Sequence, residues 1–281
     1  MANGGVIIIP DVHGRVFWRK AVKEALASKE LPTVLFLGDY VDPYPSEGIS
    51  KGDALGVFRD ILALKKKHPQ QIHLLLGNHD MGYIDPDICE CRRDEERYAL
   101  LHRLFTVNLP LFDLAWETVV DGKRFLFSHA GVNRKWLERN EAFFNGKTDI
   151  TSAELNDALH GSRFQELTQI LADVSILRGG FNAYGSVVWA DVHEFLLVEN
   201  LLDDTIQVFG HSQHDAPVCF GKESPNVYCL DCREAFVLDA SGTIRHYTSG
   251  EPVQERNTYQ YIQLTENGDL TRSIIEHYIY N

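Results

Sequence analysis

The chain has 281 residues, with 27 Lys and Arg against 40 Asp and Glu, a formal net charge of −13, and 44% of its residues are hydrophobic. This composition is that of a soluble globular protein large enough to bury a sizeable core. The apolar runs are shorter than the roughly 20 residues that span a membrane, and no basic stripe is present that would bind a nucleic-acid polymer. We therefore expect a protein that binds neither membranes nor nucleic-acid polymers. Because we recognise no secretory signal, we also expect it to be cytoplasmic.

The first third of the chain alternates strand-like and helix-like segments. Short apolar runs rich in β-branched residues predict strands over 6–9, 34–37 and 72–76. Apolar residues at helical spacing predict helices over 15–29 and 53–67. This β-α-β-α-β order implies parallel strands joined by right-handed crossovers.

After residue 80 the alternation gives way to less regular segments. We expect one domain over 1–281, because no linker or repeat separates its parts. We also expect two insertions, a mostly charged one at about 81–97 and a mostly helical one at about 140–178. Two apolar runs on either side of Asp121-Gly122 predict a β-hairpin. From Thr205 onward the pattern favours strands.

Five of the apolar strands are followed by a turn that carries Asp, Asn or His. Open α/β sheets bind ligands at the carboxyl ends of their strands, so we expect the five loops to converge on one crevice. Each motif alone is weak, whereas five in order are a specific signal. The motifs are Asp11-Val-His13-Gly14, Gly38-Asp39-Tyr-Val-Asp42, Gly77-Asn78-His79-Asp80, Ser128-His129-Ala-Gly131 and Gly210-His211-Ser-Gln-His214.

The donor atoms in these loops are carboxylates, imidazoles and an amide oxygen, which suit divalent ions such as Mn²⁺, Fe²⁺ or Zn²⁺. If the chain stays extended through Asp11-X-His13, side chains two apart point the same way and can bind one ion. The ligands exceed the needs of one ion, so two ions that share a carboxylate are expected. Cys229 and Cys232 lie in an apparent strand with no fourth ligand nearby and are expected to be buried cysteines rather than zinc ligands.

These motifs resemble those of the calcineurin-like metallophosphoesterase superfamily, and especially its serine/threonine-phosphatase-like and diadenosine-tetraphosphatase-like branch. The segments at 38–42, 77–80 and 128–132 carry the likeness, and the motifs span 11–214. The resemblance implies an α/β fold with a two-sheet sandwich flanked by helices (αββα), helical insertions, and two divalent metal ions, with Mn²⁺ expected and Fe or Zn as alternatives. The metal ligands that it implies are Asp11, His13, Asp39, Asn78, His129 and His211.

The resemblance also implies a hydrolytic mechanism. A hydroxide that bridges the metals would attack phosphorus, Asp39 would bridge the ions, and His79, oriented by Asp42, would act as general acid. The substrate would be a phosphorylated small molecule, a nucleotide or a phosphoprotein, and the enzyme a phosphomonoesterase or protein-phosphatase-like. One alternative is a dinucleoside polyphosphate pyrophosphohydrolase. Another is a non-catalytic scaffold with the same fold, which the complete set of ligands disfavours.

The sequence departs from this branch in ways that bear on phosphate binding. Pro43 follows Asp42 where the branch has an arginine that grips the substrate phosphate. Arg178, in Arg178-Gly179-Gly180, resembles a second phosphate-binding arginine of some bacterial-type members, although a surface arginine in a glycine-rich loop would look the same. Asn78 would also contact the phosphate. His211 is the expected ligand of its motif, and the role of His214, one residue further on than usual, stays open.

Overall fold

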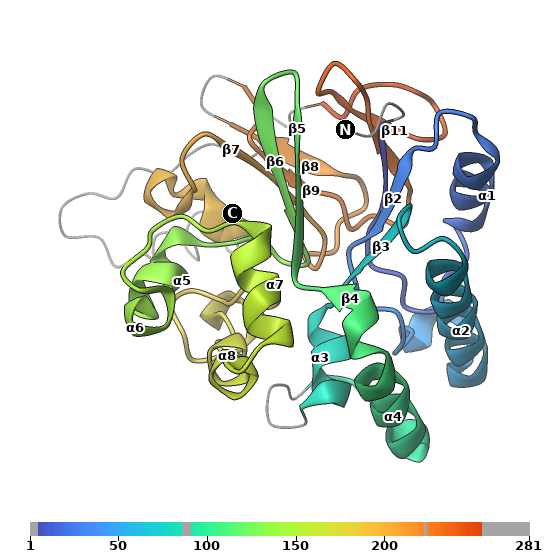
Figure 1. The fold of residues 1–281 in the computed structure, drawn as a ribbon, viewed down its shortest axis with the longest axis horizontal. Coiled ribbons are helices and arrows are strands. Elements are labelled where there is room, and N and C mark those ends of the chain that lie inside the picture. Colours follow the sequence, from blue (N-terminus) through green and yellow to red (C-terminus); the bar gives the residue numbers. More distant parts are fainter. Residues whose placement is uncertain (1–4, 86–90, 222–223, 255–281) are drawn as a thin grey trace.

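The computed structural model describes residues 5–85, 91–221 and 224–254, and two β-sheets flanked by helices lie at its centre (Figure 1). The fold class implied by the resemblance, an α/β sandwich of two sheets between helices, is thereby confirmed. The first sheet has the order β11(Ile244–His246)-β10(Phe236–Leu238)-β1(Val6–Ile9)-β2(Thr33–Phe36)-β3(Ile72–Leu75)-β4(Phe112–Asp113). The second has the order β5(Ala115–Val120)-β6(Lys123–Ser128)-β7(Thr205–Phe209)-β9(Val227–Cys229)-β8(Val218–Phe220).

The strand pairing follows the predicted order. β1, β2 and β3 are parallel neighbours, as the β-α-β-α-β pattern required. β5 and β6 form the predicted hairpin, and its two turn residues, Asp121 and Gly122, have φ of 50° and 72°. Positive φ at both positions is the requirement of the tight turn that matches the twist of the strands. The parallel pair β6 and β7 continues the second sheet.

Alternation along the strands divides the core into layers. In β1, Val6 and Ile8 face the second sheet and pack with residues such as Phe127 and Val208. Ile7 and Ile9 point to the other side and pack against the layer that contains α1 and α2. Because both faces of the strand are buried, its sequence is continuously apolar.

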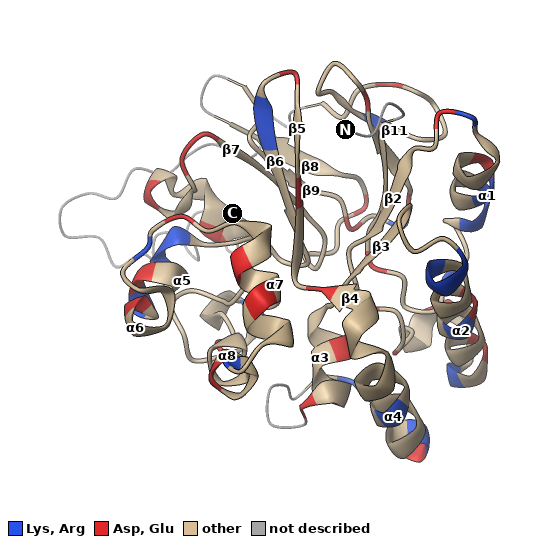
Figure 2. Cartoon of the chain, viewed as in Figure 1, with Lys and Arg blue, Asp and Glu red and all other residues tan. Residues whose placement is uncertain are grey.

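Helices cover the outer faces of the sandwich, and Figure 2 shows basic residues along α1 and α2 while the sheets are largely uncharged. The helix expected over 15–29 begins only at Arg19. Arg15 instead donates to the Glu47 carboxylate, and its backbone N–H closes a turn with the Val12 carbonyl oxygen. The helices are α1(Arg19–Ala27), α2(Lys51–Lys67), α3(Asn78–Ile84), α4(Tyr98–Asn108), α5(Arg134–Arg139), α6(Glu141–Phe144), α7(Ser152–His160) and α8(Phe164–Leu171). Short 3₁₀ helices span Pro45–Glu47, Glu95–Arg97, Leu109–Leu111, Ile176–Arg178, Val192–Leu196 and Val198–Asn200.

Two further expectations concern membranes and cysteines. Within the ranges described above, none of the helices is both long and apolar enough to cross a membrane. Cys229 is buried, as expected, whereas Cys232 is only half-buried, so the expectation of burial is wrong for Cys232.

Candidate metal centre

The five motif loops meet at one edge of the two sheets. The loops after β1, β2 and β3, which are neighbours in the first sheet, face those after β6 and β7, which are neighbours in the second. All the predicted ligands are buried, and none is more than 4% exposed. They are Asp11 and His13 after β1, Asp39 after β2, Asn78 after β3, His129 after β6 and His211 after β7.

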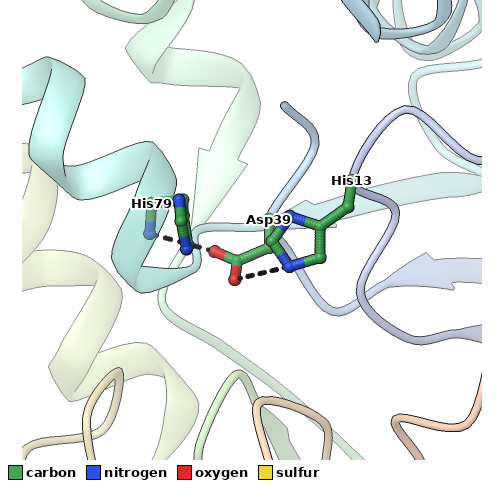
Figure 3. Close-up of side chains that lie close together, drawn as sticks. All are labelled: His13, Asp39 and His79. Atoms are coloured by element: carbon green, nitrogen blue, oxygen red, sulfur yellow. Dashed lines mark hydrogen bonds and ion pairs between the residues drawn. The ribbon is translucent and has the colours of Figure 1, made fainter. Parts of the chain in front are cut away.

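Asp39 belongs to two groups of candidate metal ligands. Donor atoms of His13, Asp39 and His79 lie within 4.8 Å of one another, and so do those of Asp39, His129 and His211. Asp39 Oδ2 is 3.4 Å from His13 Nε2 and 3.6 Å from His129 Nε2. Figure 3 shows His13 and His79 on either side of the Asp39 carboxylate. One carboxylate is therefore within reach of two clusters, as a bridging ligand must be.

The second group is the denser one. His129 Nε2 lies 3.0 Å from Asn78 Oδ1 and 3.2 Å from His211 Nδ1, and His129 Nδ1 is fixed by the Leu37 carbonyl oxygen at 2.9 Å. Asp11 Oδ1 is 4.0 Å from His129 Nε2, and the Asp11 carboxylate accepts a hydrogen bond from the His211 backbone N–H. Asp11 thus lies beside the residues of the second group.

The geometric argument for Asp11 and His13 is wrong in its local premise. His13 has φ of 43°, so the chain is not extended after β1 and the strand alternation does not continue to this residue. His13 clusters with Asp39 and His79, and Asp11 is not a member of that group within the described residues. The motif was informative because of its residue types, and the turn decides where each side chain lies.

Several site residues have a left-handed backbone, which is costly for residues other than glycine. The φ angles of His13, Asp39, Asp42 and His211 are 43°, 52°, 59° and 63°. Hydrogen bonds hold these turns: the His13 N–H donates to the Asp39 carbonyl oxygen at 2.6 Å, and the Asp39 N–H donates to the Asp80 carboxylate at 2.7 Å. The loops are therefore fixed by contacts between motifs.

Two glycines are required by the carboxylates packed against them. A Cβ at Gly77 would lie 2.1 Å from Asp39 Oδ1, and one at Gly210 would lie 2.0 Å from Asp11 Oδ2. Both distances are far shorter than a van der Waals contact. We expected the glycines of the motifs to allow close approach or positive φ, and at Gly77, whose φ is −96°, close approach is the reason.

His79 is held by acceptors on one side of its ring. Its Nδ1 lies 3.1 Å from Asp42 Oδ2 and 3.0 Å from the Arg92 carbonyl oxygen. Asp42 is held in turn by Tyr83, whose hydroxyl donates to Asp42 Oδ1 at 2.7 Å. Since both partners of Nδ1 can only accept when the carboxylate is ionised, Nδ1 carries a proton and Nε2 is the ring nitrogen left for chemistry.

The histidines differ in their pKa values. Burial lowers the pKa of His13 to about 3 and holds the pKa of His211 well below its ordinary value. Burial also acts to lower the pKa of His79, but the charges of Asp39 and Asp42 outweigh it, so the pKa of His79 is raised. Neutral imidazoles can bind metal ions, whereas a protonated one can act as an acid.

The residues present fit divalent metal ions. His211 Nε2 is buried and has no hydrogen-bond partner in the structure, although buried polar atoms are normally paired. Cys229 donates from Sγ to the carbonyl oxygens of Gly210 and Ser212, and burial raises the pKa of its thiol well above the ordinary value. The donors are therefore imidazoles, carboxylates and an amide, a mixed nitrogen and oxygen set that suits divalent ions of intermediate hardness such as Mn²⁺, Fe²⁺ or Zn²⁺.

Arg178 lies beside the second group. Its Nη2 donates to the His211 carbonyl oxygen at 3.4 Å, and its Nη1 is 3.6 Å from Asp191 Oδ2. His214 lies outside both ligand groups of the described chain, and its backbone N–H donates to the Asp231 carbonyl oxygen at 2.9 Å.

Three residues that support the site were not singled out from the sequence. Asp80 accepts hydrogen bonds from the N–H groups of both Asp39 and Gly77, and Tyr83 fixes Asp42. Asp231 is buried, neither of its carboxylate oxygens has a hydrogen-bond partner among the described residues, and burial, with the charge of Asp11, raises its pKa well above the ordinary value. Asp231 follows β9 as the motif residues follow their strands, which is the signal that could have revealed it.

The comparisons with known proteins identify the family. The sequence model of the calcineurin-like phosphoesterase family matches residues 5–233. The chain belongs to this family. This is a family of phosphoesterases that is typically dinuclear and metal-dependent, and the chain has clusters of His and Asp of the metal-binding type.

The chain is also similar to a curated protein and to two solved structures. The serine/threonine-protein phosphatase PP2A-like PPG1 of Candida albicans is 28% identical over 131 residues, which are 46% of this chain and 29% of the relative, so the match spans less than a third of that protein. A Saccharomyces cerevisiae serine/threonine phosphatase structure, with similarity to human phosphatase PP5, has a TM-score of 0.46 at 15% identity over 95% of this chain and 82% of its own. A structure provisionally named a diadenosine tetraphosphatase has a TM-score of 0.45 at 16% identity, over 91% and 95%. At these TM-scores neither structure bears on the conclusion.

Proposed function

We propose that this phosphoester hydrolase is a phosphatase with two divalent metal ions, Mn²⁺ being expected, and that it acts on phosphomonoesters or phosphoproteins. The observation that carries the proposal is the membership of Asp39 in both ligand groups. In this proposal Asp39 would take part in holding both ions, and His13 and Asp11, whose carboxylate lies beside the second group, would complete the ligands of the first. The remaining ligands of the second ion are Asn78, His129 and His211. Such ions supply Lewis acidity, because they draw charge from the phosphoryl oxygens and activate a water molecule.

The protein side chains supply the acid and the remaining phosphate contacts. His79 donates a proton from Nε2 to the leaving oxygen, while Asp42 and the Arg92 carbonyl oxygen hold Nδ1 and thereby the orientation of the ring. Arg178 and Asn78 contact the phosphate oxygens. The hydrogen bond from Arg178 Nη2 to the His211 carbonyl oxygen supports this role of Arg178, because it holds the guanidinium next to a proposed metal ligand.

Metal analysis and turnover of matched variants test the proposal. We expect about two ions per chain after loading with Mn²⁺, and a fall in metal content for Asp39→Asn. His79→Ala is expected to keep its metal but to lose about 10²–10⁴-fold in kcat. Its matched control is His68→Ala, which changes the capping residue of α2 on a different part of the molecule.

The dependence of turnover on the leaving group of the substrate shows whether His79 acts as an acid or has only a structural role. His79→Ala should cost less with p-nitrophenyl phosphate, whose leaving group needs no proton, than with an alkyl phosphate. Near wild-type turnover of this variant on alkyl phosphates would contradict the acid role, and well under one ion per chain would contradict the dinuclear site. A panel of phosphopeptides, mononucleotides and dinucleoside tetraphosphates defines the substrate class. Cleavage confined to the tetraphosphates would replace the phosphatase by the pyrophosphohydrolase.

A further inference from the structure

An arginine from outside the five motif loops lies against the Asp42–His79 pair. Arg92 accepts a hydrogen bond from His79 Nδ1 on its carbonyl oxygen, and its Nη2 donates to the Asp42 carbonyl oxygen at 3.1 Å. Its Cζ lies 3.9 Å from the centre of the Tyr44 ring, and that ring meets the His13 ring edge-on at 5.0 Å. These contacts put the guanidinium at the rim of the candidate metal centre, next to the proposed acid.

Among the described residues, no acidic side chain neutralises the charge of this guanidinium. Within the described part of the chain, no carboxylate lies within ion-pairing distance of Arg92, and the side chain is exposed. Arg15, by contrast, is buried and paired with both carboxylate oxygens of Glu47 at 2.8 Å, and Arg178 pairs with Asp191. A guanidinium has five N–H donors, and the bond to Asp42 uses one of them. Arg92 is therefore able to bind an anion.

The backbone that carries Arg92 is anchored to the site. The Asp94 N–H donates to the Tyr83 hydroxyl at 2.6 Å, and this hydroxyl donates to Asp42 Oδ1. Asp94, only 2% exposed, also pairs with Arg97 at 3.1 Å and Lys51 at 3.6 Å. A side chain on such a support loses less entropy when it binds a ligand than one on a loose loop.

We propose that Arg92 binds an oxygen of the substrate's phosphate group and that Tyr44 holds the plane of its guanidinium for this contact. The inference rests on the proposed function, because it deepens the substrate binding of the same site. A phosphate ester offers oxygens that match two N–H donors of a guanidinium, and such charge-assisted pairs are about twice as strong as neutral hydrogen bonds. Arg92 thus supplies, from a separate segment, a cation that the motif Asp42-Pro43 does not contain.

Substitutions of Arg92 separate its side chain from its backbone, since every variant keeps the carbonyl oxygen that holds His79. Arg92→Ala and Arg92→Gln are expected to weaken inhibition by inorganic phosphate and to raise KM for p-nitrophenyl phosphate by about 10- to 100-fold. Gln keeps part of the side-chain length and an N–H donor but has no charge, so the comparison of Gln with Lys reports on the contribution of the charge. Arg92→Lys should recover part of the loss. Arg103→Ala, which removes an exposed arginine of α4, is the matched control and should behave as wild type.

The readouts distinguish this proposal from the one on which it rests. Phosphate binding is measured by calorimetry on the metal-loaded protein, beside metal content and kcat. Unchanged metal content with weaker phosphate binding supports the role of Arg92. Wild-type phosphate affinity and KM in Arg92→Gln would overturn it while leaving the phosphatase proposal intact. A wild-type chain that binds metal but hydrolyses none of the phosphate esters would overturn the phosphatase proposal instead.

Discussion

Replacing Gly77 with alanine tests whether the position of Asp39 depends on the missing side chain. Gly77 has φ of −96° and ψ of 178°, a conformation that alanine adopts without strain. The new Cβ would lie 2.1 Å from Asp39 Oδ1 and 2.7 Å from the Asp39 backbone nitrogen, whereas ordinary contacts begin at 3.4 Å, so the carboxylate and the loop backbone must both shift. This shift disturbs the hydrogen bond that the His79 N–H donates to Asp39 Oδ1 at 3.0 Å.

The expected effect falls on function more than on folding. Overpacking of this kind costs about 1–3 kcal/mol of stability, whereas an error of about 1 Å in a site can lower turnover by about 10²-fold. Gly77→Ala should therefore fold, lose metal affinity and lose most of its turnover. Gly56→Ala is the control: it lies in α2 with nothing within 4 Å of the added Cβ, and it should gain about 0.5–1 kcal/mol of stability. Metal content and turnover in Gly77→Ala equal to those of Gly56→Ala would refute the reasoning.

The remaining predictions concern two buried groups near the site. Burial raises the pKa of Glu194 from 4.5 to about 7, so between these values the folded protein binds a proton that the unfolded chain has lost. Stability should therefore fall by about 3 kcal/mol as the pH rises from 4.5 to 7, and denaturant unfolding of Glu194→Gln should show a flatter pH dependence; the same slope as wild type would contradict this. Tyr83→Phe leaves the buried Asp94 N–H without its acceptor, which should cost about 1–3 kcal/mol. It should also lower kcat at unchanged metal content, and full turnover would exclude Tyr83 from the positioning of Asp42.

The strands and the convergence of the loops could be predicted because local and global patterns agree. Val6–Ile9 is apolar on both faces and is buried on both faces, so a continuous apolar run was the correct signal. The rule that ligands bind at the carboxyl ends of parallel strands then predicted that Asp39 and His129 lie close together, and they do so across the two sheets. Neither step required knowledge of the loop conformations.

The arrangement within the site could not be predicted because it depends on turns and on contacts between distant segments. Left-handed backbone at His13 and Asp39 has only a weak sequence signature, because Asp and His adopt it more often than most residues but far less often than glycine. The hydroxyl of Tyr83 reaches Asp42 over 41 residues of sequence, and the carbonyl oxygen of Arg92 reaches His79 over 13. A carbonyl oxygen is present at every residue, so nothing in the sequence marks Arg92 as the one that contacts this ring.

The net charge of −13 gives no measure of the field that a phosphate group meets at the site. Asp11, Asp39 and Asp42 are buried there, and in a medium of low dielectric their negative charge repels an anion more strongly than surface acids do. Divalent ions at this cluster would reverse its sign locally. The two arginines at the rim, Arg92 and Arg178, keep their charge next to the ligand groups whether or not ions are bound. Selective phosphate binding by an acidic protein therefore requires cations that are placed at the site, and the overall excess of acids can reside elsewhere on the chain.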